Sequence, residues 1–307
     1  MIFFRKSFNF GSCISHLLAN LRHSLRSFLG TREQLSKITF TNHSKIMIVE
    51  QIWTNNAYRN FNYLVACPET GEAMAIDPFE HLQCLACAQE KGWVITQILN
   101  THEHRDHIGG NAAMIEATGA KLLAHAQAGS RIEGIDRGLE AGDVVRVGTT
   151  VELLVLDTPG HTMSHICLLH DTDDPTLFSG DALFAAGAGN CRGGGDPTKL
   201  FETFSQQLSQ LSGSTRIYPG HDYLANNLGF TLDREPNNAR ASALLSEVSR
   251  SNKPFVTTMA LEREINPFLR LDNETVIRQL RVSFPDMPEQ PSAEEVFLRL
   301  RELRDQW

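Results

Sequence analysis

The feature that most constrains this chain is a cluster of three histidines and one aspartate within six residues. The cluster follows a short apolar run, Val94–Leu99, which predicts a buried strand. Side-chain packing has no need for so many imidazoles in one turn, whereas imidazole and carboxylate together suit zinc, iron or manganese. The segment therefore predicts a metal site at a strand end, built from His102, His104, Asp106 and His107.

Three further candidate ligands stand where other predicted strands end. Each lies beside a glycine, at which the backbone can turn and direct a side chain. Because α/β folds gather their sites at one sheet edge, we expect these residues to meet the cluster, giving enough donors for two metal ions with a shared carboxylate. We expect the nearby Thr162 and His165 to fix ligand orientation. The three ligands are His161 after 151–156, Asp181 after 177–178 and His221 after 216–218.

The order of apolar runs predicts the fold class. Short strands mix with helical segments up to about residue 224, which indicates a layered α/β body with its strands inside. The remainder shows helical patterns and no strand. The predicted strands are 61–66, 74–77, 94–99, 121–124, 151–156, 166–169, 177–178 and 216–218, and the predicted helices are 80–91, 108–118, 196–211, 236–251, 257–264, 273–281 and 292–305.

Charge separates an N-terminal extension from the body. Residues 1–46 carry a net charge of +6, against −14 for the rest. The extension is rich in serine and carries an apolar helical stripe, which is typical of a mitochondrial transit peptide; a misassigned start before Met47 accounts for it equally. We therefore predict domains at 47–224 and 225–307. The expected location is cytoplasmic, or the mitochondrial matrix if the extension is a transit peptide.

Composition excludes several classes of protein. The acidic body argues against nucleic-acid binding, which requires clustered Lys and Arg. No apolar run approaches the roughly 20 residues that span a bilayer. Six cysteines in 307 residues are too few for a disulfide scaffold. We expect a soluble intracellular monomer that acts on a small molecule, without nucleic-acid or membrane partners.

The His-x-His-x-Asp-His cluster resembles the signature of the metallo-β-lactamase superfamily. Segments 158–161, 179–181 and 219–221 match that superfamily in order and spacing. The resemblance implies an αββα sandwich with a metal site at one sheet edge, followed here by a helical C-terminal domain. It also implies how the ligands divide: His102, His104 and His161 at one metal, Asp106, His107 and His221 at a second, and Asp181 bridging.

Within that superfamily the chain is similar to glyoxalase II, the hydroxyacylglutathione hydrolase. The similar stretches are 101–111, 158–167 and 221–223, and the helical C-terminal region is a further mark of that enzyme. The resemblance implies methylglyoxal detoxification by hydrolysis of S-(2-hydroxyacyl)glutathione, such as S-D-lactoylglutathione, to a 2-hydroxy acid and glutathione. A hydroxide between two divalent metals, with zinc favoured over iron or manganese, would be the nucleophile, and Asp106 and His107 the catalytic residues.

The expected glutathione contacts lie outside the metal cluster. Tyr223, Arg301 and Arg304 would hold the tripeptide, since the two arginines share a helix face and can bind carboxylates. The basic residue that usually follows the family's glycine loop is displaced here. Asn190 and Arg192 stand beside a triple glycine instead, and we expect them to contact the substrate.

Three alternative functions remain open at this point. A persulfide dioxygenase of the same fold uses one iron, but it normally lacks a long helical tail. A hydrolase of another thioester or of a lactone is favoured by the departure at 190–195. A metal-binding module without activity has no need for so complete a ligand set.

Overall fold

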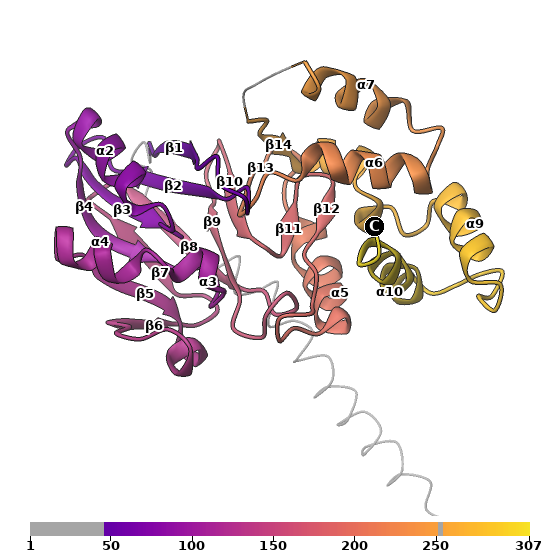
Figure 1. Cartoon of the computed structure of the whole chain (residues 1–307), viewed down its shortest axis with the longest axis horizontal. Coiled ribbons are helices and arrows are strands. Elements are labelled where there is room, and N and C mark those ends of the chain that lie inside the picture. Colours follow the sequence, from indigo (N-terminus) through magenta and orange to yellow (C-terminus); the bar gives the residue numbers. More distant parts are fainter. Residues whose placement is uncertain (1–45, 251–253) are drawn as a thin grey trace, which may run out of the picture. The chain divides into compact units, whose positions relative to one another are not determined.

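Two six-stranded sheets pack face to face and enclose the main hydrophobic core (Figure 1). The structure is a computed structural model that describes residues 46–250 and 254–307; apart from Ile46, the predicted extension lies outside the described residues. Residues 44–307 cluster as one unit, and the division at residue 224 stays a prediction.

The first sheet has the strand order β1-β2-β3-β4-β5-β6. Its first three strands are antiparallel, and the last four run parallel to one another. The strand β1 was not among the predicted elements. The strands are β1 (Ile48–Trp53), β2 (Phe61–Ala66), β3 (Glu72–Ile76), β4 (Val94–Leu99), β5 (Lys121–His125) and β6 (Arg137–Leu139).

The second sheet has the order β14-β13-β10-β9-β8-β7 and is antiparallel except for the pair β10 and β13. A small hairpin of β11 (Leu183–Phe184) and β12 (Gly187–Ala188) follows β10. The strands of the sheet are β7 (Val144–Val147), β8 (Val151–Asp157), β9 (Ile166–His170), β10 (Thr176–Gly180), β13 (Arg216–Pro219) and β14 (Thr257–Thr258). The prediction that no strand follows residue 223 was therefore wrong, because β14 adds two residues to the sheet edge.

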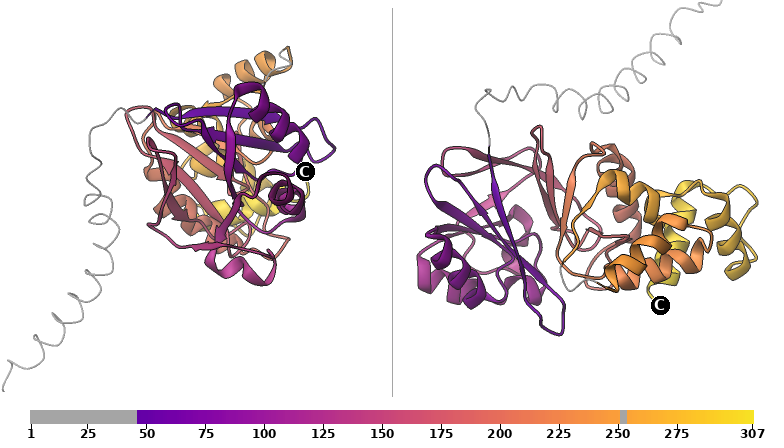
Figure 2. Two further views of the ribbon diagram at one scale, coloured as in Figure 1. Left: turned by 90° about the vertical axis from the view of Figure 1, so that its left-hand side faces the viewer. Right: turned by 90° about the horizontal axis from the view of Figure 1, so that it is seen from above.

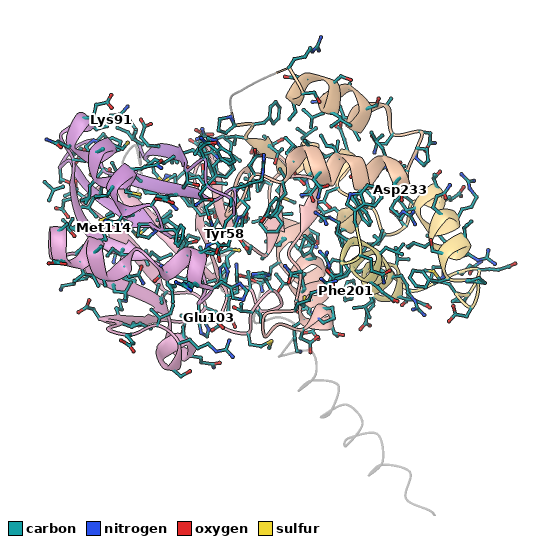
Figure 3. The ribbon with its side chains drawn as sticks, viewed as in Figure 1. Tyr58, Lys91, Glu103, Met114, Phe201 and Asp233 are labelled. Carbon is teal, nitrogen blue, oxygen red and sulfur yellow. The ribbon has the colours of Figure 1, made fainter. Side chains whose placement is uncertain are left out.

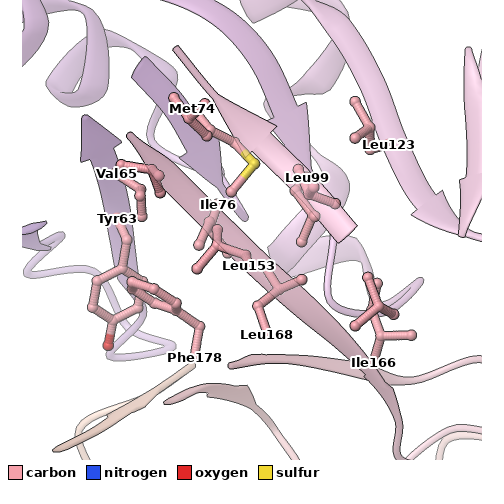
Figure 4. Close-up of a cluster of buried hydrophobic side chains, with 14 of the residues drawn as sticks. Tyr63, Val65, Met74, Ile76, Leu99, Leu123, Leu153, Ile166, Leu168 and Phe178 are labelled. Carbon is pink, nitrogen blue, oxygen red and sulfur yellow. The ribbon is translucent and has the colours of Figure 1, made fainter. Parts of the chain in front are cut away.

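Strand β2 shows why the sheets lie inside the fold. Tyr63 and Val65 point into the core between the two sheets (Figure 4), while Leu64 packs toward the helices on the outer face. Successive side chains of a strand face opposite sides, so a strand covered on both faces is largely apolar, and in β2 Asn62 is the one polar residue. Helices α2 (His81–Lys91) and α4 (Asn111–Thr118) supply that outer cover.

The second sheet is covered on its far side by helices, so the layers run helix, sheet, sheet, helix (Figure 2). Helix α5 (Pro197–Gln206) begins where predicted, because the Asp196 side chain accepts hydrogen bonds from the first backbone N–H groups and Pro197 fits the first turn. The predicted helix 108–118 is broken. The break lies between 105–108 and 111–118, which form two separate helices. A Cβ at Gly110 would lie 1.9 Å from the carbonyl oxygen of Pro78, so only glycine fits at this position.

The C-terminal part is a group of helices joined to α5 through aromatic side chains. Phe297 packs edge to face against Phe204 of α5 and against Phe268, at 5.2 and 5.1 Å between ring centroids, and Phe204 and Phe268 are tilted at 6.4 Å. The first helix of this part was not predicted. The elements are α6 (Leu224–Arg234), α7 (Ala239–Val248), α8 (Met259–Ile265), the 3-10 turn η3 (Pro267–Leu269), α9 (Glu274–Ser283) and α10 (Ala293–Arg304). None of the helices in the described residues is long and apolar enough to cross a membrane.

Candidate metal centre

Four strands deliver the predicted ligands to one edge of the two sheets. The loop after β4 continues into helix α3 (Arg105–Ile108), which begins earlier than predicted and places Asp106 and His107 in its first turn. All seven predicted ligands fall into three overlapping groups of close donor atoms. The strand that precedes each ligand is β4 for His102, β8 for His161, β10 for Asp181 and β13 for His221.

Three imidazoles form the first group. His104 Nδ1 lies 3.1 Å from His102 Nε2 and 2.9 Å from His161 Nε2. His104 Nε2 donates to the carbonyl of Gly193, and His161 Nδ1 donates to the carbonyl of Asn190, because a carbonyl can only accept. The facing nitrogens therefore carry lone pairs. Lone pairs that point at one another are satisfied by a cation between them, so this group fits a metal ion.

The second group repeats this arrangement with Asp106, His107 and His221. The two imidazole Nε2 atoms lie 3.2 Å apart, and Asp106 Oδ2 lies 3.4 Å from His221 Nε2. Again the outer nitrogens donate, His107 Nδ1 to a carboxylate oxygen of Asp77 and His221 Nδ1 to the carbonyl of Tyr58. When these imidazoles are neutral, their inner nitrogens carry lone pairs, so the group fits a second metal ion.

Asp181 lies between the two groups. Its Oδ2 is 3.5 Å from His161 Nε2 and 3.2 Å from His221 Nε2, while Oδ1 is 3.5 Å from His107 Nε2. Within the described residues Oδ1 is buried without a hydrogen-bond partner. A buried anionic oxygen needs a partner, and a carboxylate placed between two donor groups fits a bridge between two metals.

Burial favours the neutral form of two imidazoles in the first group, His102 and His161. Burial lowers the pKa of His102 well below its ordinary value and lowers the pKa of His161 to about 4. Burial alone would raise the pKa of Asp181, but the imidazoles of His221 and His107 hold it well below its usual range. His102 and His161 are thus unprotonated and Asp181 is ionised, which is the state that binds metal. At His107 burial opposes protonation, but the carboxylates of Asp181 and Asp77 raise the pKa well above its ordinary value, so metal binding there releases a proton.

Two residues that support the ligands were missed in the sequence. Asp77, at the end of β3, accepts from the Thr101 backbone N–H at 2.8 Å, from the Thr101 hydroxyl at 2.6 Å and from His107 at 2.9 Å. Asn60 donates its amide to Asp106 Oδ2 at 3.2 Å. Asp77 stands at the end of a predicted strand, as the ligands do, so its position at a strand end could have identified it. Nothing in the sequence indicated Asn60.

The predicted supporting residues His165 and Thr162 have different partners. His165 Nε2 accepts from the backbone N–H of Asp181 at 3.1 Å, which fixes the turn that carries this carboxylate. Thr162 instead donates to the buried Glu103 at 2.9 Å, alongside Ser164 at 2.7 Å. Figure 3 shows Glu103 below Tyr58, with both to the right of Met114 of helix α4.

The predicted substrate contacts divide into rim and interior residues. Tyr223 stacks on His221 with centroids 5.0 Å apart, and its hydroxyl donates to the Tyr58 carbonyl. Arg304 is half-buried and donates to Asn227 at 2.9 Å. Asn190 and Arg192 lie on a loop over the first group, and both are exposed. Arg301 is 4% exposed, and its guanidinium donates to a carbonyl group inside the protein, so its contact with substrate stays a prediction.

Comparison with known proteins agrees with this geometry. The family model described as Metallo-beta-lactamase superfamily matches residues 62–221, and the one described as Hydroxyacylglutathione hydrolase C-terminus matches residues 222–307. The hydroxyacylglutathione hydrolases of Nitrosococcus oceani and of a Polaromonas species are each 64% identical over 263 residues. Each alignment covers 85% of this chain and 100% of the relative.

Solved structures agree on the fold. The crystal structure of ETHE1 from Myxococcus xanthus is 26% identical, with a TM-score of 0.58, and the match covers 83% of this chain and 99% of that one. TTHA1623 in a di-iron-bound form is 27% identical, with a TM-score of 0.51, over 72% of this chain and 100% of that one. The fold, the paired donor groups and the helical C-terminal region all lead to the same assignment. The chain belongs to the hydroxyacylglutathione hydrolase family of the metallo-β-lactamase superfamily.

Proposed function

We propose that this chain is a metal-dependent thioesterase that hydrolyses S-(2-hydroxyacyl)glutathione, such as S-D-lactoylglutathione, to a 2-hydroxy acid and glutathione. The observation that carries the proposal is the pair of donor groups that converge on Asp181. The relatives of 64% identity carry the name of this activity over their whole length, and the C-terminal match favours the thioesterase over a dioxygenase.

The ligand sets follow from the two groups. His102, His104 and His161 would hold one divalent metal, and Asp106, His107 and His221 the other, with Asp181 shared. Imidazole and carboxylate donors favour zinc, with iron and manganese also accepted. A bound metal pair makes water a strong nucleophile near neutral pH and polarises a carbonyl group.

The chain's own residues position the reactants. Asp106, held by the Asn60 amide at 3.2 Å, presents a fixed carboxylate that orients the attacking water. His107 is oriented by Asp77 through a hydrogen bond of 2.9 Å, so its inner nitrogen faces the position of the metal. The glutathione thiol, with a pKa of about 8.5 when free, leaves as a thiolate and needs no dedicated acid.

The glutathione portion would lie on the rim that faces the helical part. Tyr223 and Arg304 come from the start of α6 and the end of α10, and Asn190 and Arg192 come from the loop over the first group. Glutathione carries two carboxylates, which arginine side chains bind with paired N–H groups. These contacts define the expected thiol specificity.

A comparison of two thioesters tests the proposal. The comparison substrate, S-D-lactoyl-N-acetylcysteamine, lacks both carboxylates of glutathione and so loses one or two charge-assisted hydrogen bonds. The kcat/KM for S-D-lactoylglutathione is therefore expected to be roughly 10- to 100-fold higher than for that substrate. Equal kcat/KM values for the two thioesters would show that the enzyme does not recognise the glutathione portion of its substrate. Absence of turnover on both, with metal bound, would remove the thioesterase itself.

A further inference from the structure

The side chain of Glu103 is a buried carboxylate that stands between two metal ligands in the sequence. It is 3% exposed, yet it belongs to none of the three donor groups in the described residues. The neighbouring His102 and His104 direct their nitrogens toward the first metal position, whereas Glu103 meets a different set of partners. A buried carboxylate is costly unless it is well bonded, so these partners indicate what it does.

Three donors hold the Glu103 carboxylate. One oxygen, Oε2, accepts from the hydroxyl groups of Thr162 at 2.9 Å and of Ser164 at 2.7 Å. The other oxygen, Oε1, accepts from the guanidinium of Arg131, which follows the 3-10 turn η1 (Ala126–Ser130). Because one donor is charged and two are hydroxyl groups, the carboxylate is satisfied by the protein itself.

The two segments that Glu103 joins, 101–104 and 161–165, carry all three ligands of the first donor group. Their nearest backbone connection is the hydrogen bond from the Ile166 N–H to the Thr101 carbonyl at 2.9 Å. Beyond that point, in the part of the chain that the structure describes, the hydrogen bonds that cross between the segments are those of Glu103, apart from the contact between the ligand imidazoles. The carboxylate therefore acts as a cross-link between the ligand segments.

The arginine side of this network reaches the glycine loop. A Cβ at Gly194 would lie 3.3 Å from Arg131 Nη1, so the loop passes close to the guanidinium. The preceding residue, Gly193, accepts from His104 Nε2 at 3.1 Å through its carbonyl. The ion pair of Arg131 and Glu103 thus lies against the loop that orients one ligand and is bonded to the segment that carries another.

The first donor group needs such a support. Its imidazole nitrogens approach one another to 2.9 and 3.1 Å with lone pairs facing, which is unfavourable until a cation lies between them. Holding the two segments at this spacing lowers the cost of arranging the ligands when the metal binds.

From this network we infer that Glu103 is a positioning residue for the first metal. It links the two ligand segments and holds them at the spacing that a metal ion requires. Thr162, which the sequence predicts to fix ligand orientation, acts on the ligands through Glu103. The inference rests on the proposed function, because it assigns Glu103 a role toward the proposed metal pair.

The expected effect is selective for one metal. Loss of a partner that orients a ligand costs roughly 10- to 100-fold in metal affinity. The second donor group is oriented by residues at the end of β3 and in segment 58–60, and those hydrogen bonds do not include Glu103. Changing Glu103 should therefore weaken the first metal and leave the second in place.

The experiment compares Glu103→Met and Glu103→Gln with the wild-type chain, all loaded with zinc. Glutamine keeps one acceptor, and its amide can donate to hydroxyl groups, which accept as well as donate. Glu235→Met is the matched control, because Glu235 is also a buried carboxylate held by an arginine, Arg270, and by two amides, but lies among the C-terminal helices. Metal content is measured by mass spectrometry after dialysis against a graded chelator series, and steady-state kinetics give kcat and KM separately.

The Glu103→Met protein is expected to release one of its two metals at about 10- to 100-fold lower chelator concentration than wild type, and to lose kcat more than KM. Glu103→Gln is expected to fall between Met and wild type, and it carries the test if the Met variant does not fold. Glu235→Met is expected to release both metals as wild type does, which separates the effect from a general loss of stability.

A second background identifies the metal that is affected. In His104→Ala, which is expected to keep only the second metal, adding Glu103→Met should leave the release of that metal unchanged. Wild-type release of both metals from Glu103→Met, or equal weakening of both, would overturn the inference. A wild-type chain that binds two zinc ions but does not hydrolyse S-D-lactoylglutathione would overturn the proposed function, while metal release would still decide the role of Glu103. A wild-type chain that binds no zinc would overturn both.

Discussion

Glu262 gives a stability prediction whose sign follows from its surroundings. This carboxyl group is 0% exposed, and its oxygens accept from the Ala186 backbone N–H at 2.9 Å and from the Asn266 amide at 2.9 Å. Burial outweighs these hydrogen bonds and raises the pKa of Glu262 from 4.5 to about 7. Between these two pH values the folded chain keeps a proton that the unfolded chain has lost, so stability falls as pH rises.

The size of the effect follows from the shift. A difference of about 2.5 pKa units corresponds to roughly 3 kcal/mol, fully present below pH ~4.5 and lost as the pH passes ~7. Glu262→Gln keeps the shape and one accepting oxygen but cannot ionise. The melting temperature of the variant relative to wild type should therefore increase by roughly 6–12 °C between pH 4.5 and pH 8, at about 2–4 °C per kcal/mol for a chain of this size.

The assay is a thermal melt of both proteins across a series of pH values, with the same metal content in each. Subtracting the two curves cancels every other titrating group, because only residue 262 differs. A difference in melting temperature that stays flat from pH 4.5 to 8 would show that Glu262 is already ionised in the folded state, and the argument from burial would fail.

Three further predictions address the metal centre and the rim. His104→Ala should lose the metal of the first group and activity together, because the ion loses the ligand that lies between His102 and His161. Metal analysis of active fractions checks this, and full turnover without that metal would contradict it. Gly193→Ala should weaken metal binding as well, since its Cβ would lie 2.4 Å from His104 Nε2, and chelator titration measures the change. Arg304→Met should raise KM several-fold more than it lowers kcat, because remote binding is lost equally in ground and transition states; an unchanged KM removes Arg304 from the substrate site.

The ligand positions were accessible from the sequence because strand ends share an edge. Apolar runs marked β4, β8, β10 and β13. The last three lie in one sheet, and β4 joins them because its own sheet packs against that one. Helix α6 escaped prediction because Asn226, Asn227 and Gly229 weaken its pattern, and tertiary packing of Leu228 and Phe230 compensates. Its N-terminus carries no side-chain cap either.

The burial of Arg301 was beyond sequence reasoning for a physical reason. The spacing of Arg301 and Arg304 places them on one helix face but does not say whether a guanidinium meets solvent or a backbone carbonyl. That depends on how closely the 188–193 loop approaches α10, which only the fold sets. Asn60 is a similar case, because its contact with Asp106 joins segments 46 residues apart.

The most direct test of the account is a metal titration of the chelator-stripped full chain, with bound metal and S-D-lactoylglutathione hydrolysis measured on the same samples. The paired donor groups predict that activity reaches its maximum at about two bound metals per chain and is absent without metal. Full hydrolysis by the metal-free chain, or a metal-loaded chain with no hydrolysis at all, would contradict the claim that these seven residues build a thioesterase centre.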